Sequence, residues 1–148
     1  GTYKVTEGYK PFIYGRNRED FPIFFEEHSL VVTFNGTRFD LPVIKKTFPA
    51  ISEPHVHVDL FLTSKRVGLK GSLKKLEKHF GISRDSEIDG MNGYDALKLW
   101  NAWFLQKDER ALELLIKYNM ADTLNLKHLA EALVRLLKEK TLPGKYKE

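Results

Sequence analysis

The spacing of apolar residues along the chain changes from the period of strands to the period of helices. Over about the first 60 residues, apolar positions occur in short runs separated by Gly, Pro, Asn and Glu, which is typical of strands joined by turns. From residue 69 onward they recur at steps of three and four, which keeps them on one face of a helix. Strands followed by helices indicate an α/β fold, with helices packed around a sheet, rather than a helical bundle or a β-sandwich.

Four segments are predicted to be strands. Residues 3–6 and 9–14 lie on either side of Glu7-Gly8, which favours a hairpin. Residues 29–34 are almost continuously apolar or β-branched, as in a central strand that is covered on both faces. Residues 55–60 alternate strictly between polar and apolar side chains, which predicts a further strand.

Turn and cap residues mark the predicted helices. Pro42 fits the first turn of a helix that ends before Phe48-Pro49. Gly81 fits a C-cap, and Asp108 fits the N-terminal cap of the longest helix. The predicted helices cover residues 21–27, 42–47, 69–80, 95–104 and 110–138.

The composition limits the class of protein and its partners. The 148 residues suit one domain, predicted here over residues 1–140, with residues 141–148 as a flexible tail. No apolar run approaches the roughly 20 residues of a membrane span. The chain has no cysteine, which excludes disulfides and thiolate metal sites, and its first residues carry no secretory pattern, so we expect a cytoplasmic protein. The net charge of +4 and pI near 9.2 lean towards a polyanionic partner such as nucleic acid.

An acidic residue interrupts the apolar face of the last predicted helix. An ionised carboxylate that faces a core costs on the order of several kcal/mol unless a metal ion, a cation or several hydrogen bonds compensate it. Asp122 is therefore a candidate metal ligand; on spacing alone, it could equally lie at a helix edge, in contact with water or as a cap of a neighbouring element. The residues that share this face with it are Leu115, Tyr118, Leu126, Leu129 and Leu133.

A second acid, Asp40, follows a predicted strand and the Asn35-Gly36 turn. This order places it at the carboxyl end of the sheet, where open α/β folds keep their ligand crevice, so Asp40 is a candidate catalytic acid. The alternative is structural, because an Asp shortly before Pro42 is also an ordinary N-cap.

The order and spacing of four segments resemble the ribonuclease H-like exonucleases. The likeness runs from about residue 9 to residue 133, and its closest match is the bacterial and archaeal branch related to 3′-to-5′ proofreading exonucleases of the DEDD type. The first segment looks like the second exonuclease motif of that family, and the last looks like the tyrosine form of the third. The segments are Asn35-Gly36-x-x-Phe39-Asp40, His57-Val58-Asp59-Leu60, residues 68–74 and Tyr118-x-x-x-Asp122.

The resemblance implies a mixed sheet flanked by helices and a two-metal hydrolysis of phosphodiester bonds at DNA or RNA ends. It gives metal-binding roles to Asp40 and Asp122, and it lets Tyr118 orient the attacking water. The implied ions are Mg²⁺ or Mn²⁺, which are hard cations that prefer oxygen ligands. Two such ions, about 3.5 to 4 Å apart, can generate hydroxide and neutralise the charge that builds on the leaving oxygen.

One motif of the family is absent. The family carries Asp-x-Glu on the strand that opens the fold, and no Asp-x-Glu occurs before Asp40. We therefore expect that the usual first strand is missing, that half of the metal-binding carboxylates are missing with it, and that this chain alone could be inactive. The gap in the sheet invites a strand from another chain, through strand exchange or a homo-oligomer.

Nucleic-acid contacts are expected from the second motif and from the densest basic run. Positions 70, 74 and 78 form an i, i+4 row on the flank of a predicted helix, and such a row could hold a phosphate backbone of a single-stranded end. Charged rows also cover most exposed helices, so a plain solvated face is the alternative. The residues assigned to nucleic acid are Asn35, Gly36, Phe39, Lys70 and Lys74.

Two lesser groups have a functional and a structural interpretation. His55, His57 and Asp59 share a strand face and could bind iron or zinc, but alternation on a partly solvated strand gives the same pattern. Asp59 alone is expected near the crevice as an outer ligand rather than as a catalytic residue. Aromatic side chains that could stack on bases, although their helical spacing favours the core, are Trp100, Trp103 and Phe104.

Three hypotheses about function follow. The first is a metal-dependent 3′-to-5′ exonuclease, and the second is a catalytically silent nucleic-acid-binding module with the same fold. The third is a protein-interaction domain with no nucleic-acid role. Chelator-sensitive shortening of an oligonucleotide distinguishes the first, and salt-sensitive binding without cleavage distinguishes the second.

Overall fold

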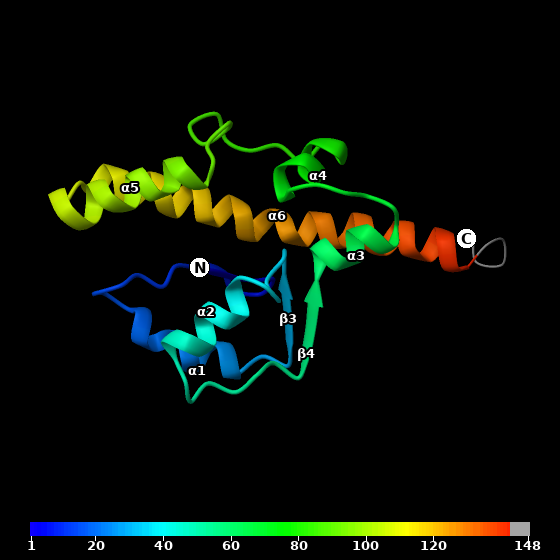
Figure 1. The fold of residues 1–148 in the computed structure, drawn as a ribbon, viewed down its shortest axis with the longest axis horizontal. Helices are drawn as coiled ribbons and strands as arrows, with labels where there is room; N and C mark the ends of the chain where they lie inside the picture. The colour runs from blue at the N-terminus through cyan, green and yellow to red at the C-terminus, as the bar shows by residue number, and fades with distance from the viewer. Residues whose placement is uncertain (143–148) are drawn as a thin grey trace. The chain divides into compact units, whose positions relative to one another are not determined.

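The computed structural model describes residues 1–142, so most of the tail predicted at 141–148 lies outside the described residues. Strands come early and helices dominate afterwards, which confirms the α/β class (Figure 1). The elements are β1 (Thr2–Lys4), β2 (Gly8–Lys10), the 3₁₀ helix η1 (Arg18–Asp20), α1 (Phe21–Glu26), β3 (Leu30–Thr33), α2 (Asp40–Thr47), β4 (Val56–Asp59), α3 (Leu60–Arg66), α4 (Leu73–His79), α5 (Gly93–Gln106) and α6 (Glu109–Thr141).

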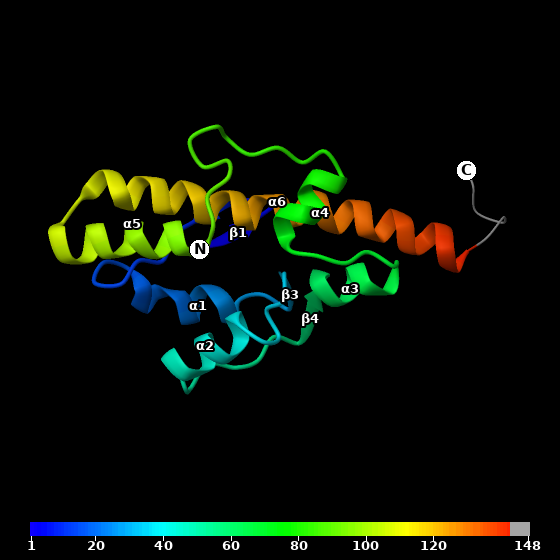
Figure 2. The same ribbon diagram turned by 45° about the horizontal axis from the view of Figure 1, so that its top comes forward.

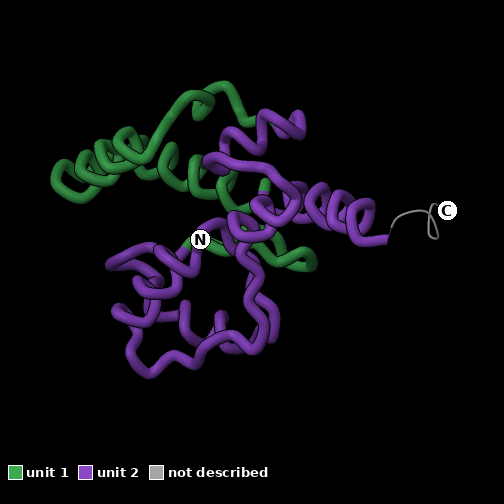
Figure 3. The backbone as a smooth tube through the Cα atoms, turned by 45° about the vertical axis from the view of Figure 1, so that its right-hand side comes forward, with its two compact units in different colours: residues 1–11, 83–125 green, residues 12–82, 126–148 purple. Residues whose placement is uncertain are grey.

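The chain forms two compact units, which Figure 3 shows in different colours. Unit 1 contains residues 1–11 and 83–125, and unit 2 contains residues 12–82 together with the chain from residue 126 onward. Each unit therefore combines segments that are far apart in the sequence. Helix α6 contributes its first half to unit 1 and its second half to unit 2.

The sheet of unit 2 is a parallel pair of strands. Strands β3 and β4 run side by side in the same direction (Figure 1), and the segment between them contains α2. Parallel strands need such a crossover, because a tight turn can only reverse the chain. The register pairs Thr33 with Asp59, so the carboxyl ends of both strands meet at one edge. The segment Asn35-Gly36-x-x-Phe39-Asp40, which resembles the second exonuclease motif, follows β3 at this edge.

The prediction that residues 29–34 form a strand covered on both faces is wrong in one respect. Leu30 and Val32 are 53% and 36% exposed, whereas the alternate residues Val31 and Thr33 are partly buried. Val56 on β4 is also exposed. Among the described residues, the sheet has only these two strands, so only one face is packed.

The core of unit 2 forms where α3 and α4 pack on the second half of α6 (Figure 2). Leu129 and Leu133 are fully buried, as the apolar stripe predicts. Burial of each such side chain contributes roughly 1.5 to 3 kcal/mol. The buried cluster consists of Leu60, Val67, Leu76, Leu129 and Leu133.

Helix α4 begins later than the sequence predicts. Gly71 has a φ of +141°, which few other residues adopt, and Ser72 caps the helix by accepting a hydrogen bond from the Lys75 amide. Lys70 therefore precedes the helix instead of lying in an i, i+4 row with Lys74. The predicted basic row of three residues is wrong, although Lys74 and Lys78 do lie on α4.

Local capping signals predict the other helix ends well. Asp108 accepts a hydrogen bond from the Ala111 amide at the start of α6, and Gly81, with a φ of +69°, follows α4. Asn92 and Asp95 form a capping box, so α5 begins slightly earlier than predicted. None of the helices in residues 1–142 combines the length and the apolar character that a membrane span needs.

Unit 1 combines a hairpin with two helical segments. Strands β1 and β2 pair antiparallel around the predicted turn, which confirms the hairpin, and Gly8 has a φ of +83°. β2 ends at Lys10 because Pro11 has no amide hydrogen to continue the ladder. Buried apolar residues in α5, in the first half of α6 and in the segment before α5 are Trp103, Ala111, Leu112 and Ile88.

Candidate functional site

The predicted site residues divide between the two units. The Asn35-Gly36 turn, Phe39 and Asp40 belong to unit 2. Tyr118 and Asp122 lie on the part of α6 that belongs to unit 1. Each group has its own geometry, which follows from its own unit.

The turn between β3 and α2 is closely packed against the end of β3. Asn35 adopts a left-handed conformation with a φ of +60°, which asparagine tolerates better than most residues. Gly36 is buried, and a Cβ at this position would lie 2.3 Å from the Thr33 hydroxyl oxygen. Only glycine therefore fits here without a shift of the chain.

Asp59, at the end of β4, binds this turn with its carboxylate. Oδ1 accepts from the amides of Asn35 (2.7 Å) and Phe61 (3.1 Å), and Oδ2 accepts from the Thr37 amide (3.2 Å) and the Thr37 hydroxyl (2.8 Å). Asp59 is 6% exposed. Burial by itself raises the pKa of this carboxyl, but the hydrogen bonds from Thr37, Asn35 and Phe61 outweigh it and lower the pKa from 3.8. The side chain is therefore ionised at neutral pH.

Asp40 is the first residue of α2 and does not cap it. The N-cap position belongs to Phe39, and no side chain at that position accepts a capping hydrogen bond, so the alternative prediction of Asp40 as N-cap is wrong. Burial raises the pKa of Asp40, a hydrogen bond from its own main-chain amide opposes this rise, and repulsion by the Asp59 carboxylate adds to it. The residue as a whole is exposed, so water weakens these effects. Phe39 is 64% exposed beside it.

The predicted metal site of two histidines and one carboxylate does not form. His55 precedes β4, and the His57 Nε2 lies 2.8 Å from the Thr33 hydroxyl. Both oxygens of Asp59 already accept hydrogen bonds from main-chain amides. Over residues 1–142, no group of three or more His, Asp or Glu side chains could hold a metal ion.

In unit 1, the carboxylate of Asp122 pairs with an arginine. Arg84 Nη2 donates to Asp122 Oδ1 at 2.6 Å; the arginine side chain is 4% exposed and the aspartate side chain 34% exposed. The guanidinium also lies over the Tyr118 ring, 5.5 Å from its centre. The charge of Asp122 on the apolar face of α6 is therefore compensated by a cation, the guanidinium of Arg84. Arg84 is 38 residues away in sequence, and no local pattern marks it.

Tyr9 is a further contact that the sequence did not reveal. Its hydroxyl donates to Asn119 Oδ1 at 2.8 Å and joins β2 to the middle of α6. Burial raises the pKa of Tyr9 to about 12, so the phenol stays protonated at neutral pH. Asn119 directly follows Tyr118, so this hydrogen bond connects β2 to the helix segment that carries the predicted motif.

An Asp-x-Glu sequence does occur in unit 1, at Asp85 and Glu87. It lies in the segment before α5 and not on a strand. Lys117 donates to Glu87 and approaches Asp85 to 3.0 Å, and Arg110 donates to Glu87 at 2.6 Å. A hydrogen bond from the Glu87 amide and then the contact with Lys117 lower the pKa of Asp85, and the contacts with Lys117 and Arg110 lower the pKa of Glu87. The pair therefore forms a surface ion network.

The basic and aromatic groups differ in exposure. Lys70 is exposed and Lys74 is partly buried. Trp103 is 7% exposed, which confirms the core interpretation for this residue. Phe104 is 40% exposed and stacks on Trp100 with ring centres 5.7 Å apart. Of these aromatic side chains, Trp103 therefore belongs to the core, whereas Phe104 lies at the surface.

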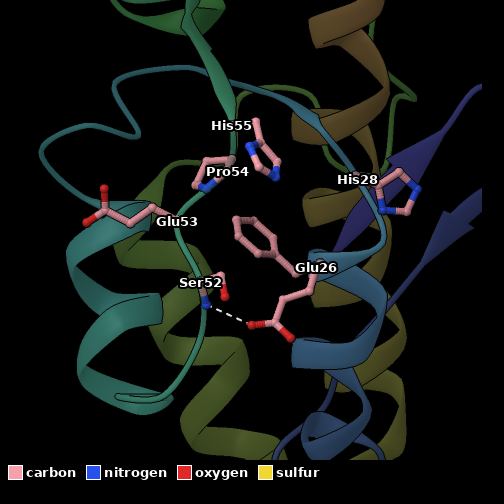
Figure 4. Close-up of a pocket in the computed structure, with 7 residues that line it drawn as sticks. Glu26, His28, Ser52, Glu53, Pro54 and His55 are labelled. Carbon is pink, nitrogen blue, oxygen red and sulfur yellow. Dashed lines mark hydrogen bonds between the residues drawn. The ribbon is translucent and has the colours of Figure 1, made fainter.

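A small pocket of unit 2, shown in Figure 4, is formed by the end of α1 and the segment before β4. Ser52 donates its main-chain amide to Glu26 Oε1 at 2.7 Å across this pocket. None of the predicted site residues lines it. The lining residues are Phe25, Glu26, His28, Ser52, Glu53, Pro54 and His55.

Comparison with known proteins identifies the family. The sequence matches the family described as RNase_H superfamily over residues 2–134, which covers parts of both units and both predicted motifs. No curated protein and no solved structure matches the chain. Members of this superfamily are generally nucleases that bind nucleic acid and usually use divalent metal ions. Because the match covers far more than half of the sequence, the chain belongs to the RNase H superfamily.

Proposed function

We propose that the chain is a metal-dependent nuclease, acting as a 3′-to-5′ exonuclease on single-stranded DNA or RNA ends. Asp40 and Asp122 are the proposed metal-binding carboxylates, and Tyr118 is the proposed water-orienting group. The proposal is carried by one observation: Asp40 is an exposed acid at the carboxyl end of a parallel strand, and it does not cap its own helix.

The electrostatics of Asp40 support a cation as its ligand. Asp59 lies close enough for its charge to raise the pKa of Asp40. A divalent ion at Asp40 would relieve this repulsion, because it favours the ionised form of the carboxyl. Carboxylate oxygens are the ligands that Mg²⁺ and Mn²⁺ prefer. When bound, such ions would supply a water molecule of lowered pKa and a counter-charge for the phosphate.

Nucleic-acid contacts are proposed at the residues around Asp40 and on the basic segment before α4. The 64% exposed ring of Phe39 presents a surface on which an unpaired base can stack. Asn35 is proposed to contact the same strand through its side chain and Gly36 to shape the turn, because the main-chain N–H and C=O groups of both are already hydrogen-bonded within the protein. Lys70 and Lys74 are proposed to contact phosphates, which positions a strand without reading its sequence.

A second candidate function is supported by the ion pair of Asp122. The buried guanidinium of Arg84 already neutralises this carboxylate, so a metal ion at Asp122 would have to share it with the arginine. This ion pair favours a catalytically silent nucleic-acid-binding module as the alternative.

The test incubates the 148-residue chain with 5′-labelled single-stranded DNA or RNA in Mn²⁺ or Mg²⁺, with and without EDTA. We expect shortening from the 3′ end that EDTA stops. Asp40→Asn and Asp122→Asn should each reduce the rate by at least about 100-fold, since loss of even an outer-shell partner of a metal site costs 10- to 100-fold.

Matched controls are Asp20→Asn in unit 2 and Asp89→Asn in unit 1, both at exposed aspartates outside the proposed site. Their rates should equal that of the wild type. Salt-sensitive binding without shortening would overturn the nuclease proposal and support the silent module. Neither binding nor shortening would overturn both, and would leave a protein-interaction domain.

A further inference from the structure

We propose that Asp59 is a positioning residue of the candidate site: through the main chain and hydroxyl of Thr37, it fixes the turn that carries Phe39 and Asp40. This inference rests on the proposed function, in which Asp40 binds the metal ion. Asp59 itself is not assigned to the metal or the substrate. Its role is to act through the turn.

The number of hydrogen bonds to Asp59 exceeds what a helix cap requires. An N-cap side chain accepts from one or two amides at the start of its own helix, and Asp59 does this with the Phe61 amide. Three further donors reach it from Asn35 and Thr37, which are 22 to 24 residues away in sequence. The carboxylate therefore joins the end of β4 to the turn that follows β3.

The hydrogen bonds continue from Asp59 to the start of α2. The turn directs its amides at Asn35 and Thr37 towards Asp59, while its carbonyls accept from residues that lead into the helix. Asn35 accepts from the Phe39 amide at 3.2 Å, and Gly36 accepts from the Leu41 amide at 2.9 Å. Asp40 lies between these two amides, so the backbone on both of its sides is bonded to the anchored turn.

The chemistry of the anchor requires a carboxylate. Each oxygen of Asp59 accepts from two donors, and at 6% exposure water does not replace a lost partner. Hydrogen bonds to a charged oxygen are also stronger than those to a neutral one. Asparagine at this position would keep one acceptor and would point an amide group at two of the donors.

Thr37 allows the inference to be tested without disturbing a buried residue. Thr37 is exposed, and its hydroxyl donates to Asp59 Oδ2 at 2.8 Å. Thr37→Val keeps the shape of the side chain and removes this hydrogen bond, whereas Thr37→Ser keeps it. Thr47→Val is the matched control, because the Thr47 hydroxyl is also exposed and donates within α2, to the Val43 carbonyl at 2.8 Å.

We expect Thr37→Val to lower kcat of the exonuclease about tenfold, which is typical for an outer-shell partner, with KM changed less than about twofold. Thr37→Ser should restore kcat, and Thr47→Val should leave it unchanged. Thr37→Val should melt below Thr47→Val, because it loses a hydrogen bond to a charged oxygen, so the rates are compared at a temperature at which both variants are folded. Equal rates for these two variants, or a loss of rate that serine does not restore, would overturn the positioning role.

A second measurement separates this inference from the proposed function. Mn²⁺ should broaden the NMR signal of the Asp40 amide in the wild type, and the broadening should weaken in Thr37→Val but not in Thr47→Val. Amide exchange at Asn35 and Thr37 should accelerate at least about tenfold in Asp59→Asn, because the amides lose their acceptor. A wild type that does not shorten oligonucleotides overturns the proposed function. Unchanged broadening and exchange in the variants overturn the positioning role, whatever the activity.

Discussion

Asp40 and Asp122 occupy opposite electrostatic environments within their respective units. Asp40 is exposed, has another aspartate as its neighbour, and forms no salt bridge with a lysine or arginine of residues 1–142. Asp122 is bonded to the buried guanidinium of Arg84. Asp40 is therefore accessible to a cation from solution, whereas the carboxylate of Asp122 is already paired with a cation of the same unit. The comparison makes Asp40 the more accessible of the two proposed ligands, because a metal ion at Asp122 would have to share the carboxylate with Arg84.

The largest loss of stability is expected when Asp59, which binds the turn before Asp40, is replaced. Asp59→Asn should lower the free energy of unfolding by about 3 kcal/mol at pH 7, because at least two hydrogen bonds to a charged oxygen are lost. The folded-state pKa of Asp59 is lowered, so its stabilisation is present above 3.8 and is lost as the pH falls through the lower folded value. The difference between wild type and variant should therefore shrink below pH 3.8, as urea unfolding would measure. A difference that is constant with pH would contradict this.

A smaller loss is expected when the Asp122 pair is broken. Arg84→Met removes the cation and leaves a partly buried carboxylate on an apolar helix face, which should cost about 2 kcal/mol in unfolding free energy. Arg135→Met, at an exposed position of α6, is the matched control and should change stability by less than about 0.5 kcal/mol. Equal stabilities of the two variants would show that the environments of Asp40 and Asp122 do not differ as described.

The smallest change in unfolding free energy is expected for Asp40→Asn, and its sign is opposite to that expected for Asp59→Asn. The folded-state pKa of Asp40 is raised, so its ionised form opposes folding at neutral pH. Asp40→Asn should therefore be slightly more stable than the wild type at pH 7, and the difference should disappear as the pH falls below 3.8. Mn²⁺ should reverse the order, because it stabilises only the protein that binds it. Thermal unfolding with and without Mn²⁺ measures both stability differences. An Asp40→Asn variant that is less stable than the wild type at pH 7 without metal would contradict the predicted sign.

The features that the sequence predicted correctly depend on local chemistry. The Asn35-Gly36 turn, the cap at Asp108 and the buried Leu129 and Leu133 all follow from spacing and from conformations that few residue types adopt. The placement of Asp40 after a parallel strand follows from the order of elements alone. These signals lie within a few residues of the position that they predict.

The features that the sequence missed depend on residues brought together by tertiary folding. Arg84 lies 38 residues before Asp122, and Thr37 lies 22 residues before Asp59. The need for a partner could be read from an acid on an apolar face, but its identity could not, because several cations lie at comparable distances in sequence. Lys70 was misplaced for a different reason: Gly71 and Ser72 delay the start of α4 until Leu73, whereas the apolar spacing already begins at Leu69.

The apolar surface of the β3–β4 pair bears on how the protein behaves at high concentration. Leu30, Val32 and Val56 are exposed side by side on two adjacent strands, and parallel pairs are usually covered on both faces. Such a surface, with open strand edges, favours association between copies. Samples of this chain should therefore self-associate as they are concentrated. Rates measured at nanomolar protein will describe the dispersed chain, and those measured at the concentrations used for NMR will require a check by light scattering.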